Sequence, residues 1–204
     1  MTTKLDRLLA AFHTVLAGID HALVSDFVSR IRWNMDARPL GARPLACLRH
    51  LDRAAEIAPS FAKPLATFLA EERGRFRWGQ TYAEADLGKP FVDNYGWLEV
   101  FGARGHFIND TFAGGILILG PNLLYPDHHH IAEEIYVPLT GGTCWRKEDK
   151  DFAIRQAGEV IYHASNVSHA MQTGSDPLLA LYLWHGGPLD QKSSVTGTIS
   201  SGKA

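Results

Sequence analysis

The sequence predicts a mainly β protein, a barrel or jelly roll, that carries an α-helical N-terminal extension. Before residue 75 the apolar residues recur at steps of three and four, which is the period of a helix. Later apolar residues fall in short runs separated by Gly, Pro, Asn and Asp, the pattern of strands and turns. We therefore expect a helical extension at 1–74, a barrel at 75–189 and a poorly ordered Ser/Thr/Gly-rich tail at 190–204.

The extension is expected to form helices that carry one apolar stripe each. The expected ranges are 5–33, divided near Gly18 or Ser25–Asp26, then 44–58 and 60–72. Pro44 suits a first helical turn, whereas Pro59 and Gly74 end the two later helices. The stripe of the first helix pair must be covered either by the outer face of the barrel or by a second subunit, so a homodimer is one of two expected arrangements.

Short apolar runs without intervening helices predict the strands of the barrel. We expect strands at Gly96–Phe101, Thr111–Leu119, Leu123–His128, Glu134–Leu139, Gly142–Lys147, Glu159–Tyr162, Ser168–Thr173 and Leu178–Trp184.

The composition argues against nucleic-acid binding and against a membrane-spanning or secreted protein. The 204-residue chain is 46% hydrophobic and 21% charged, with a net charge of -2, so it has no basic excess for nucleic acid. Charged residues and histidines interrupt the N-terminal apolar run before a signal peptide or membrane span could form, and we expect a cytoplasmic protein. Cys47 and Cys144 are expected to be free thiols. A small molecule is the expected partner.

The segment 125–136 predicts a metal site, because its residues read His128-x-His130-x-x-x-Glu134-x-Tyr136. Side chains two apart on a strand share a face, so His128 and His130 can point inward together, as can Glu134 with Tyr136. A later imidazole, His163 or His169, would complete a ligand set that suits one divalent transition metal and leaves positions open for substrate. The alternative for the histidines is a solvated polar loop.

These segments resemble the two sequence motifs of the cupins. Gly120 to Gly141 resembles the first motif and Gly158 to Thr173 the second, in which the ligand histidine comes eleven residues after the glycine. The resemblance implies a jelly-roll barrel and selects His169, rather than His163, as the last ligand. The chain departs from the motifs at Gly120, which lies further from His128 than usual, and at Ala164 and Thr173, where Pro and Asn are common.

Among cupins, the segment 125–136 and the helical first third are similar to the dimethylsulfoniopropionate (DMSP) lyases of marine bacteria. The most specific feature is the tyrosine two residues after the ligand glutamate, at position 136. The resemblance implies a metal-assisted β-elimination that yields dimethyl sulfide and acrylate, with Tyr136 as the base. Imidazole and carboxylate ligands suit several first-row ions, so the metal is Zn, Fe, Mn, Co or Ni. Without the resemblance, Tyr136 would be read as an aromatic residue that fills the barrel.

The chemistry of the elimination indicates which further residues it needs. A tyrosine with a reference pKa near 10 becomes a base at neutral pH only when a nearby cation favours its phenolate. Tyr125 is a second candidate, either as a hydroxyl that orients substrate or as a packing residue. Aromatic faces attract a sulfonium, so Trp184, Tyr182 and Tyr162 are candidates for a substrate wall, although core packing is the commoner use of such residues.

Three other functions remain open at the level of the sequence. One is a related lyase that acts on another small carboxylate, and another is an iron-dependent dioxygenase, which would not need Tyr136 as a base. The third is a non-catalytic ligand-binding protein of the same fold.

Overall fold

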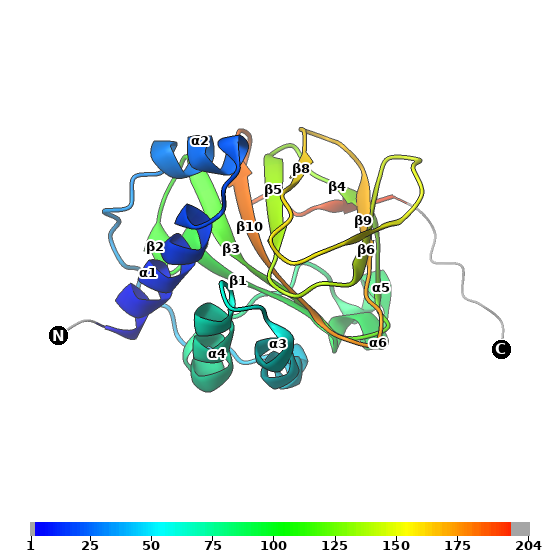
Figure 1. Ribbon diagram of the computed structural model, residues 1–204, viewed down its shortest axis with the longest axis horizontal. Helices are drawn as coiled ribbons and strands as arrows, with labels where there is room; N and C mark the ends of the chain where they lie inside the picture. Colours follow the sequence, from blue (N-terminus) through cyan, green and yellow to red (C-terminus); the bar gives the residue numbers. More distant parts are fainter. Residues whose placement is uncertain (1–2, 197–204) are drawn as a thin grey trace.

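The computed structural model describes residues 3–196, and its elements follow the expected order of helices and then strands. Figure 1 shows the arrangement. The helices are α1 (Lys4–Ala17), α2 (Ala22–Arg30), η1 (Ala46–His50), α3 (Leu51–Ile57), α4 (Lys63–Glu72), η2 (Arg73–Arg75), α5 (Glu84–Leu87) and α6 (Lys89–Val92). The strands are β1 (Tyr95–Gly102), β2 (Phe107–Ile108), β3 (Phe112–Leu119), β4 (Leu124–His129), β5 (Glu133–Pro138), β6 (Thr143–Lys147), β7 (Ala153–Arg155), β8 (Ile161–His163), β9 (His169–Gln172), β10 (Leu178–His185) and β11 (Ser194–Val195).

The strands form two facing sheets. One has the order β2-β1-β3-β10-β5-β8, and the other has the order β11-β4-β9-β6-β7. All pairs are antiparallel except β1 with β2, and most neighbours are far apart in sequence, which is the connectivity of a jelly roll. The predicted fold class, a jelly-roll barrel with an N-terminal helical extension, is confirmed.

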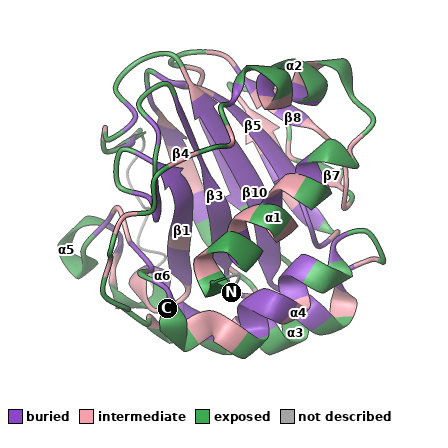
Figure 2. Ribbon diagram, turned by 90° about the vertical axis from the view of Figure 1, so that its left-hand side faces the viewer, coloured by how far each residue is buried: buried purple, intermediate pink, exposed green. Residues whose placement is uncertain are grey.

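The helices of the extension cover the outer face of the six-stranded sheet. Helix α1 begins at a capping box, in which the side chains of Thr3 and Asp6 bond each other's backbone amides. Its buried residues, among them Phe12, face the sheet, and the Phe12 ring meets Phe101 of β1 edge to face at 5.7 Å. Figure 2 shows α1, α3 and α4 in front of the buried strands β1, β3 and β10. Of the two expected arrangements, the barrel therefore covers the helical stripe within one chain.

Both faces of the six-stranded sheet are buried, and this divides the apolar residues into two cores. On β10, Leu179, Leu181 and Leu183 face the helices. Tyr182 and Trp184 alternate with them and belong to the core inside the barrel. This alternation explains why β10 is a continuous apolar run, since each side of it packs against other side chains.

Several elements differ from the expectations, and all of them are short. Strands β2, β7 and β11 and the one-turn helices α5 and α6 were not expected, because two to four residues carry no periodicity. The tail was expected to be poorly ordered from residue 190, but within its described part Ser194 and Val195 form a strand. They pair with His129 and His128 at the edge of β4. Backbone hydrogen bonds to the edge of β4 order these two residues, although the tail has few apolar side chains to bury. The rest of the tail, 197–204, lies outside the described residues.

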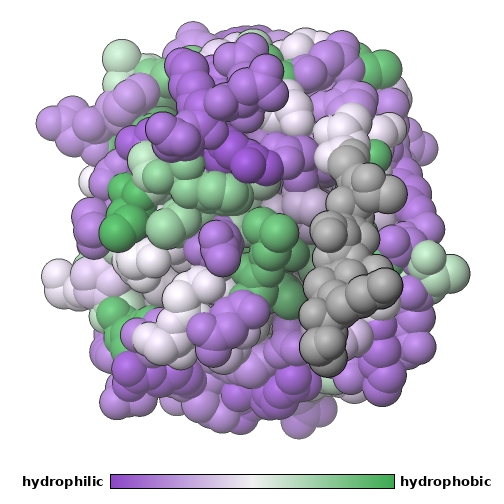
Figure 3. Space-filling view, turned by 90° about the vertical axis from the view of Figure 1, so that its right-hand side faces the viewer, coloured by the Kyte–Doolittle hydropathy of each residue, from purple (hydrophilic) through white to green (hydrophobic). Residues whose placement is uncertain are grey.

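The two cysteines are free thiols, as expected, and the face of the molecule drawn in Figure 3 is largely hydrophilic. Within residues 3–196, no helix has the length and apolar character needed to cross a membrane. Figure 3 shows a largely hydrophilic face with hydrophobic side chains gathered in its middle. Both cysteines are free, Cys47 being buried and Cys144 half-buried.

Candidate metal centre

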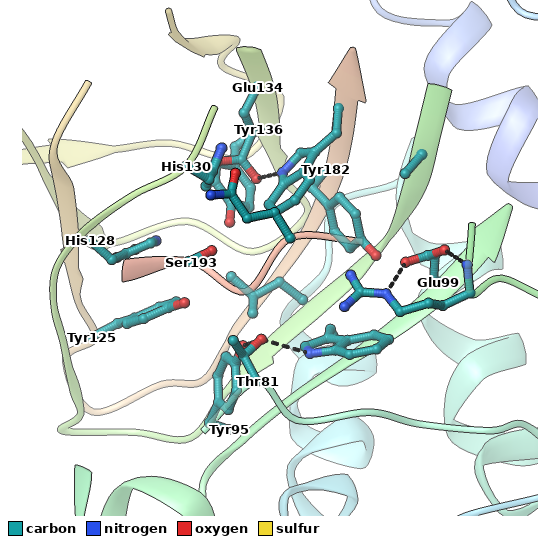
Figure 4. A pocket seen from close by; sticks show the side chains of 16 residues that line it. Thr81, Tyr95, Glu99, Tyr125, His128, His130, Glu134, Tyr136, Tyr182 and Ser193 are labelled. Carbon is teal, nitrogen blue, oxygen red and sulfur yellow. Dashed lines mark hydrogen bonds and ion pairs between the residues drawn. The ribbon is translucent and has the colours of Figure 1, made fainter. Parts of the chain in front are cut away.

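The candidate site lies inside the barrel, where β4, β5 and β9 bring their inward side chains together. His128 of β4 pairs with His169 of β9, so the two histidines are cross-strand neighbours. Glu134 and Tyr136 lie two apart on β5 and point the same way, as Figure 4 shows. His130 follows directly after β4 and reaches the same space.

Three of the four predicted ligands form one tight, buried group. The ligand atoms of His130, Glu134 and His169 all lie within 4.8 Å of one another, and all three residues are buried. The Nε2 atom of His130 lies 2.9 Å from Oε2 of Glu134, and that of His169 lies 3.3 Å from the same oxygen. Nε2 of His169 makes no hydrogen bond, so its lone pair fits a metal ion at this point.

Backbone carbonyls fix which ring nitrogen of each histidine is free. Nδ1 of His128 lies 2.8 Å from the Pro126 oxygen, that of His130 lies 2.8 Å from the Ala132 oxygen, and that of His169 lies 2.9 Å from the Val167 oxygen. A carbonyl only accepts hydrogen bonds, so each Nδ1 must carry the proton, and Nε2 of His128 and of His169 presents a lone pair. Nε2 of His130 donates to the Glu134 carboxylate and would present its lone pair when a metal cation takes the place of that proton. Histidine ligands of metals are held in this way.

The protonation states of Glu134 and His130 depend on each other. Burial acts to raise the pKa of Glu134, but His130 and His169 together hold it well below its usual value, so this carboxylate stays ionised. Burial acts to lower the pKa of His130, and the Glu134 charge and hydrogen bond reverse this and raise it. A buried anion faced by imidazoles is the donor set that a divalent cation would neutralise.

His128 lies beside the group of three rather than within it. Its ring centroid is 4.1 Å from that of His169, and burial, followed by the nearby His169, holds its pKa well below the usual value. The ring stacks on Tyr125 at 3.8 Å with an interplanar angle of 5°. Tyr125 reaches the inner face because β4 bulges between Tyr125 and His128, which places residues three apart on one side of the strand.

His163 lies next to His169 and, among the residues described, lacks the contact between Nδ1 and a backbone carbonyl that orients the other three histidines. Its ring stacks on His169 at 4.0 Å, and neither of its nitrogens has a hydrogen-bond partner. Burial, and then the proximity of His169, lower the pKa of His163 to about 3, so the ring is neutral. Without an anchored Nδ1, nothing fixes a lone pair of His163 toward the group.

Tyr136 is buried next to the group. Its ring lies 6.3 Å from that of His169 and 5.0 Å from that of Trp145. Burial and then the Glu134 charge hold the pKa of Tyr136 well above its usual value, so the residue is a neutral phenol in the protein without metal. A nearby cation would act in the opposite direction.

Of the three aromatic residues predicted for the substrate wall, two line the pocket. Trp184 stacks on His130 at 4.1 Å and donates its indole N–H to Oε1 of Glu134 at 2.6 Å. Tyr182 lines the pocket further from the group. The placement of Tyr162 needs correction: it pairs with the outward-facing Ile135, and its hydroxyl donates to Glu133 outside the barrel.

The pocket also contains residues that the sequence did not single out. Tyr95 lines the pocket beside Tyr125, whose hydroxyl lies 3.1 Å from that of Tyr82, a residue outside the lining. At the far end the buried Glu99 accepts the Arg104 backbone N–H at 2.6 Å, as Figure 4 shows. The rest of the lining consists of Trp97 on β1, Ala113 and Leu117 on β3, and the loop residues Thr81, Gln191 and Ser193. These residues belong to no motif, so only the fold identifies them.

The fold and this His/Glu group define a cupin-type barrel with a candidate metal centre. The sequence profile of the dimethylsulfoniopropionate lyase family matches residues 24–180. The chain therefore belongs to the dimethylsulfoniopropionate lyase family, as its motifs predicted.

Individual relatives agree with this assignment. The dimethylsulfoniopropionate lyase DddQ of Ruegeria pomeroyi is 34% identical over 110 residues, a match that spans 54% of this chain and 55% of that protein. A crystal structure described for the DMSP lyases RdDddP and RnDddQII has a TM-score of 0.87 and 27% identity, covering 95% of this chain and 98% of the other. The crystal structure of DddQ from Ruegeria pomeroyi has a TM-score of 0.85 at 24% identity, covering 95% and 96%, which supports the fold.

Proposed function

We propose that this protein is a metal-dependent lyase that cleaves dimethylsulfoniopropionate into dimethyl sulfide and acrylate. The observation that carries the proposal is the placement of Tyr136 beside the buried His130–Glu134–His169 group in a chain of this family. The relatives named as DMSP lyases support the choice of substrate. The cytoplasmic location expected from the sequence stays a prediction.

The proposed ligands are His128, His130, Glu134 and His169, and the metal is Zn, Fe, Mn, Co or Ni. Anchored imidazoles and a carboxylate suit each of these ions. When bound, such an ion supplies a Lewis acid for the substrate carboxylate and a positive charge that favours the phenolate of Tyr136.

Tyr136 is the proposed base. Its oxygen takes the proton from the carbon next to the substrate carboxylate. The electron pair left behind forms the double bond of acrylate, while the bond from the neighbouring carbon to sulfur breaks and dimethyl sulfide departs. Because burial holds the phenol protonated in the absence of a cation, we expect the base to form only in the loaded site.

The remaining side chains position the substrate. Tyr125 presents its hydroxyl from the stack with His128, and we propose that it orients the bound carboxylate. Trp184 and Tyr182 are the proposed wall for the sulfonium, which aromatic faces attract. Most of these residues are buried, which limits the access of bulk water to the reacting carbon.

Tyr136 also separates this proposal from the alternatives. A dioxygenase in the same barrel does not need the tyrosine as a base, and a binding protein would tolerate phenylalanine there. A lyase for another small carboxylate would keep Tyr136 and differ in the sulfonium wall.

The test is anaerobic incubation of the metal-loaded protein with dimethylsulfoniopropionate, while acrylate and dimethyl sulfide are measured. We expect equal amounts of both products with at least one of the five metals. Absence of product with all five would rule out the named substrate. A parallel aerobic incubation that consumes oxygen and yields oxygenated products in place of acrylate would favour the dioxygenase instead.

A further inference from the structure

The jelly roll is open along one side, where β8 ends one sheet and β7 ends the other. A pocket lies between these edges, and we call it the edge pocket. It shares no lining residue with the pocket of the candidate metal centre. Its principal polar residues are Trp145, Lys147, Lys150, Arg155 and His163. Its lining includes His163 and Tyr162, which the sequence offered as a metal ligand and a wall residue, but no anion-binding role follows from the motifs.

Positive charge predominates in the edge pocket. Arg146, Lys147, Lys150 and Arg155 line it, against the single acidic residue Asp151. Arg146 pairs with Asp127, and Arg155 pairs with Glu159 at 3.2 Å. Within residues 3–196 neither lysine forms a salt bridge, and Lys150 is exposed, so its ammonium is available to a ligand.

The pocket also concentrates buried polar nitrogens that have no hydrogen-bond partner among the residues that the structure describes. In the described part of the chain, seven buried side-chain nitrogens lack a hydrogen-bond partner, and five of them belong to residues of the edge pocket. They include Nε1 of Trp145, Nε of Arg155 and both ring nitrogens of His163. Indole and guanidinium nitrogens only donate, so the group that would satisfy them is an acceptor.

We propose that the edge pocket binds a small oxyanion, held by the charges of Lys150 and Arg155 and by the indole N–H of Trp145. An oxyanion supplies several acceptor oxygens and the negative charge that complements these side chains. A metal cation does not fit, since the positive side chains would repel it. A carboxylate and a phosphate share the required chemistry.

The edge pocket lies directly behind the candidate metal centre. His163 separates the two by stacking on His169 at 4.0 Å, and Trp145 packs on Tyr136 at 5.0 Å. One source of the oxyanion is therefore the acrylate released next to Tyr136, an identification that rests on the proposed function. The other source is a free inorganic anion such as phosphate.

Calorimetric titration of the metal-free protein with sodium acrylate and with sodium phosphate, at constant ionic strength, tests the site without catalysis. Omission of the metal removes the cation that would attract either anion to the metal centre, and the variants below assign any remaining binding. Saturable binding of acrylate alone identifies a product site, and binding of phosphate alone identifies an inorganic anion site. Saturable binding of neither would overturn the proposal, whatever the lyase assay shows.

Substitutions of the lining residues test whether the anion binds in the edge pocket. Lys150→Gln changes an exposed side chain, and we expect binding to weaken about threefold, whereas Trp145→Phe keeps the charge but removes one donor and should weaken it about tenfold. Lys150→Gln with Arg155→Gln should weaken binding more than tenfold. The matched control is Lys63→Gln with Arg75→Gln, which removes the same charge from the helical side and should change nothing. Equal binding by the Lys150 and Trp145 variants and wild type would place the anion elsewhere and refute the assignment.

Discussion

A backbone carbonyl orients each of three imidazoles in the candidate metal centre. The carbonyls of Pro126, Ala132 and Val167 lie within two residues of the histidines that they anchor. Local backbone geometry therefore sets the direction of each Nε2 atom before any metal binds. Such anchoring reduces the entropy that ligand binding must overcome.

The same anchors lead to a prediction about the two candidate histidines of the second motif. His169→Ala removes an anchored Nε2 from the buried group, and we expect at least a tenfold loss of metal affinity. His163→Ala removes an unanchored ring and should leave metal content within about twofold of wild type. Metal analysis of both purified variants after dialysis decides between them. The reverse pattern would make His163 the ligand.

At the residue scale, the alternation of side chains along a strand lets the sequence predict which residues face the inside of the barrel. The alternation of β5 places Glu134 and Tyr136 inward and Glu133 outward, as expected. Tyr125 could not be placed by parity because the bulge in β4 shifts the register. Tyr162 was misplaced because its strand has only three residues, and its face follows from pairing with Ile135.

At the scale of elements, β10 supports the ligand that β5 supplies. Trp184 of β10 pairs with Glu134 across the two strands and donates its indole N–H to the carboxylate oxygen that does not face His130. Both oxygens of Glu134 are thus held in place. Strand pairing brings this contact about, so no motif in the sequence reveals it.

This contact predicts a second role for Trp184 besides the substrate wall. Trp184→Phe keeps an aromatic ring against His130 but removes the donor to Glu134, and we expect metal affinity to fall about tenfold. The control is Trp97→Phe, because Trp97 lines the same pocket but donates to Thr81, away from the ligands. Competition with a metal chelator measures both. Unchanged affinity in Trp184→Phe would restrict this tryptophan to substrate binding.

At the scale of the whole molecule, the helical extension and the barrel share one core. The sequence predicted the helices and their apolar stripe, but which surface covers that stripe depends on contacts between distant parts of the chain. Phe12 of α1 and Leu181 of β10 belong to the same buried cluster. We therefore propose that the expected boundary near residue 75 divides the chain by type of secondary structure and that both parts unfold together.

Truncation of one helical side chain tests this joint unfolding. Phe12→Ala leaves a cavity against Phe101, and we expect the free energy of unfolding to fall by about 3–5 kcal/mol in a single transition. The control Leu5→Ala changes a less buried side chain of the same helix and should cost less. Denaturant unfolding followed by far-UV circular dichroism and tryptophan fluorescence reports helices and barrel together. Two separate transitions would instead make the extension an independent unit.

In the proposed reaction, Tyr136, beside a metal held by the His/Glu group, removes a proton from the substrate. The rate of acrylate release by wild type and by Tyr136→Phe at equal metal content tests this role. The variant keeps the ring and the proposed ligands and loses only the hydroxyl, so we predict full metal occupancy and a rate lowered by about 10²–10⁴-fold. A variant that binds metal and forms acrylate at the wild-type rate would show that Tyr136 is not the base.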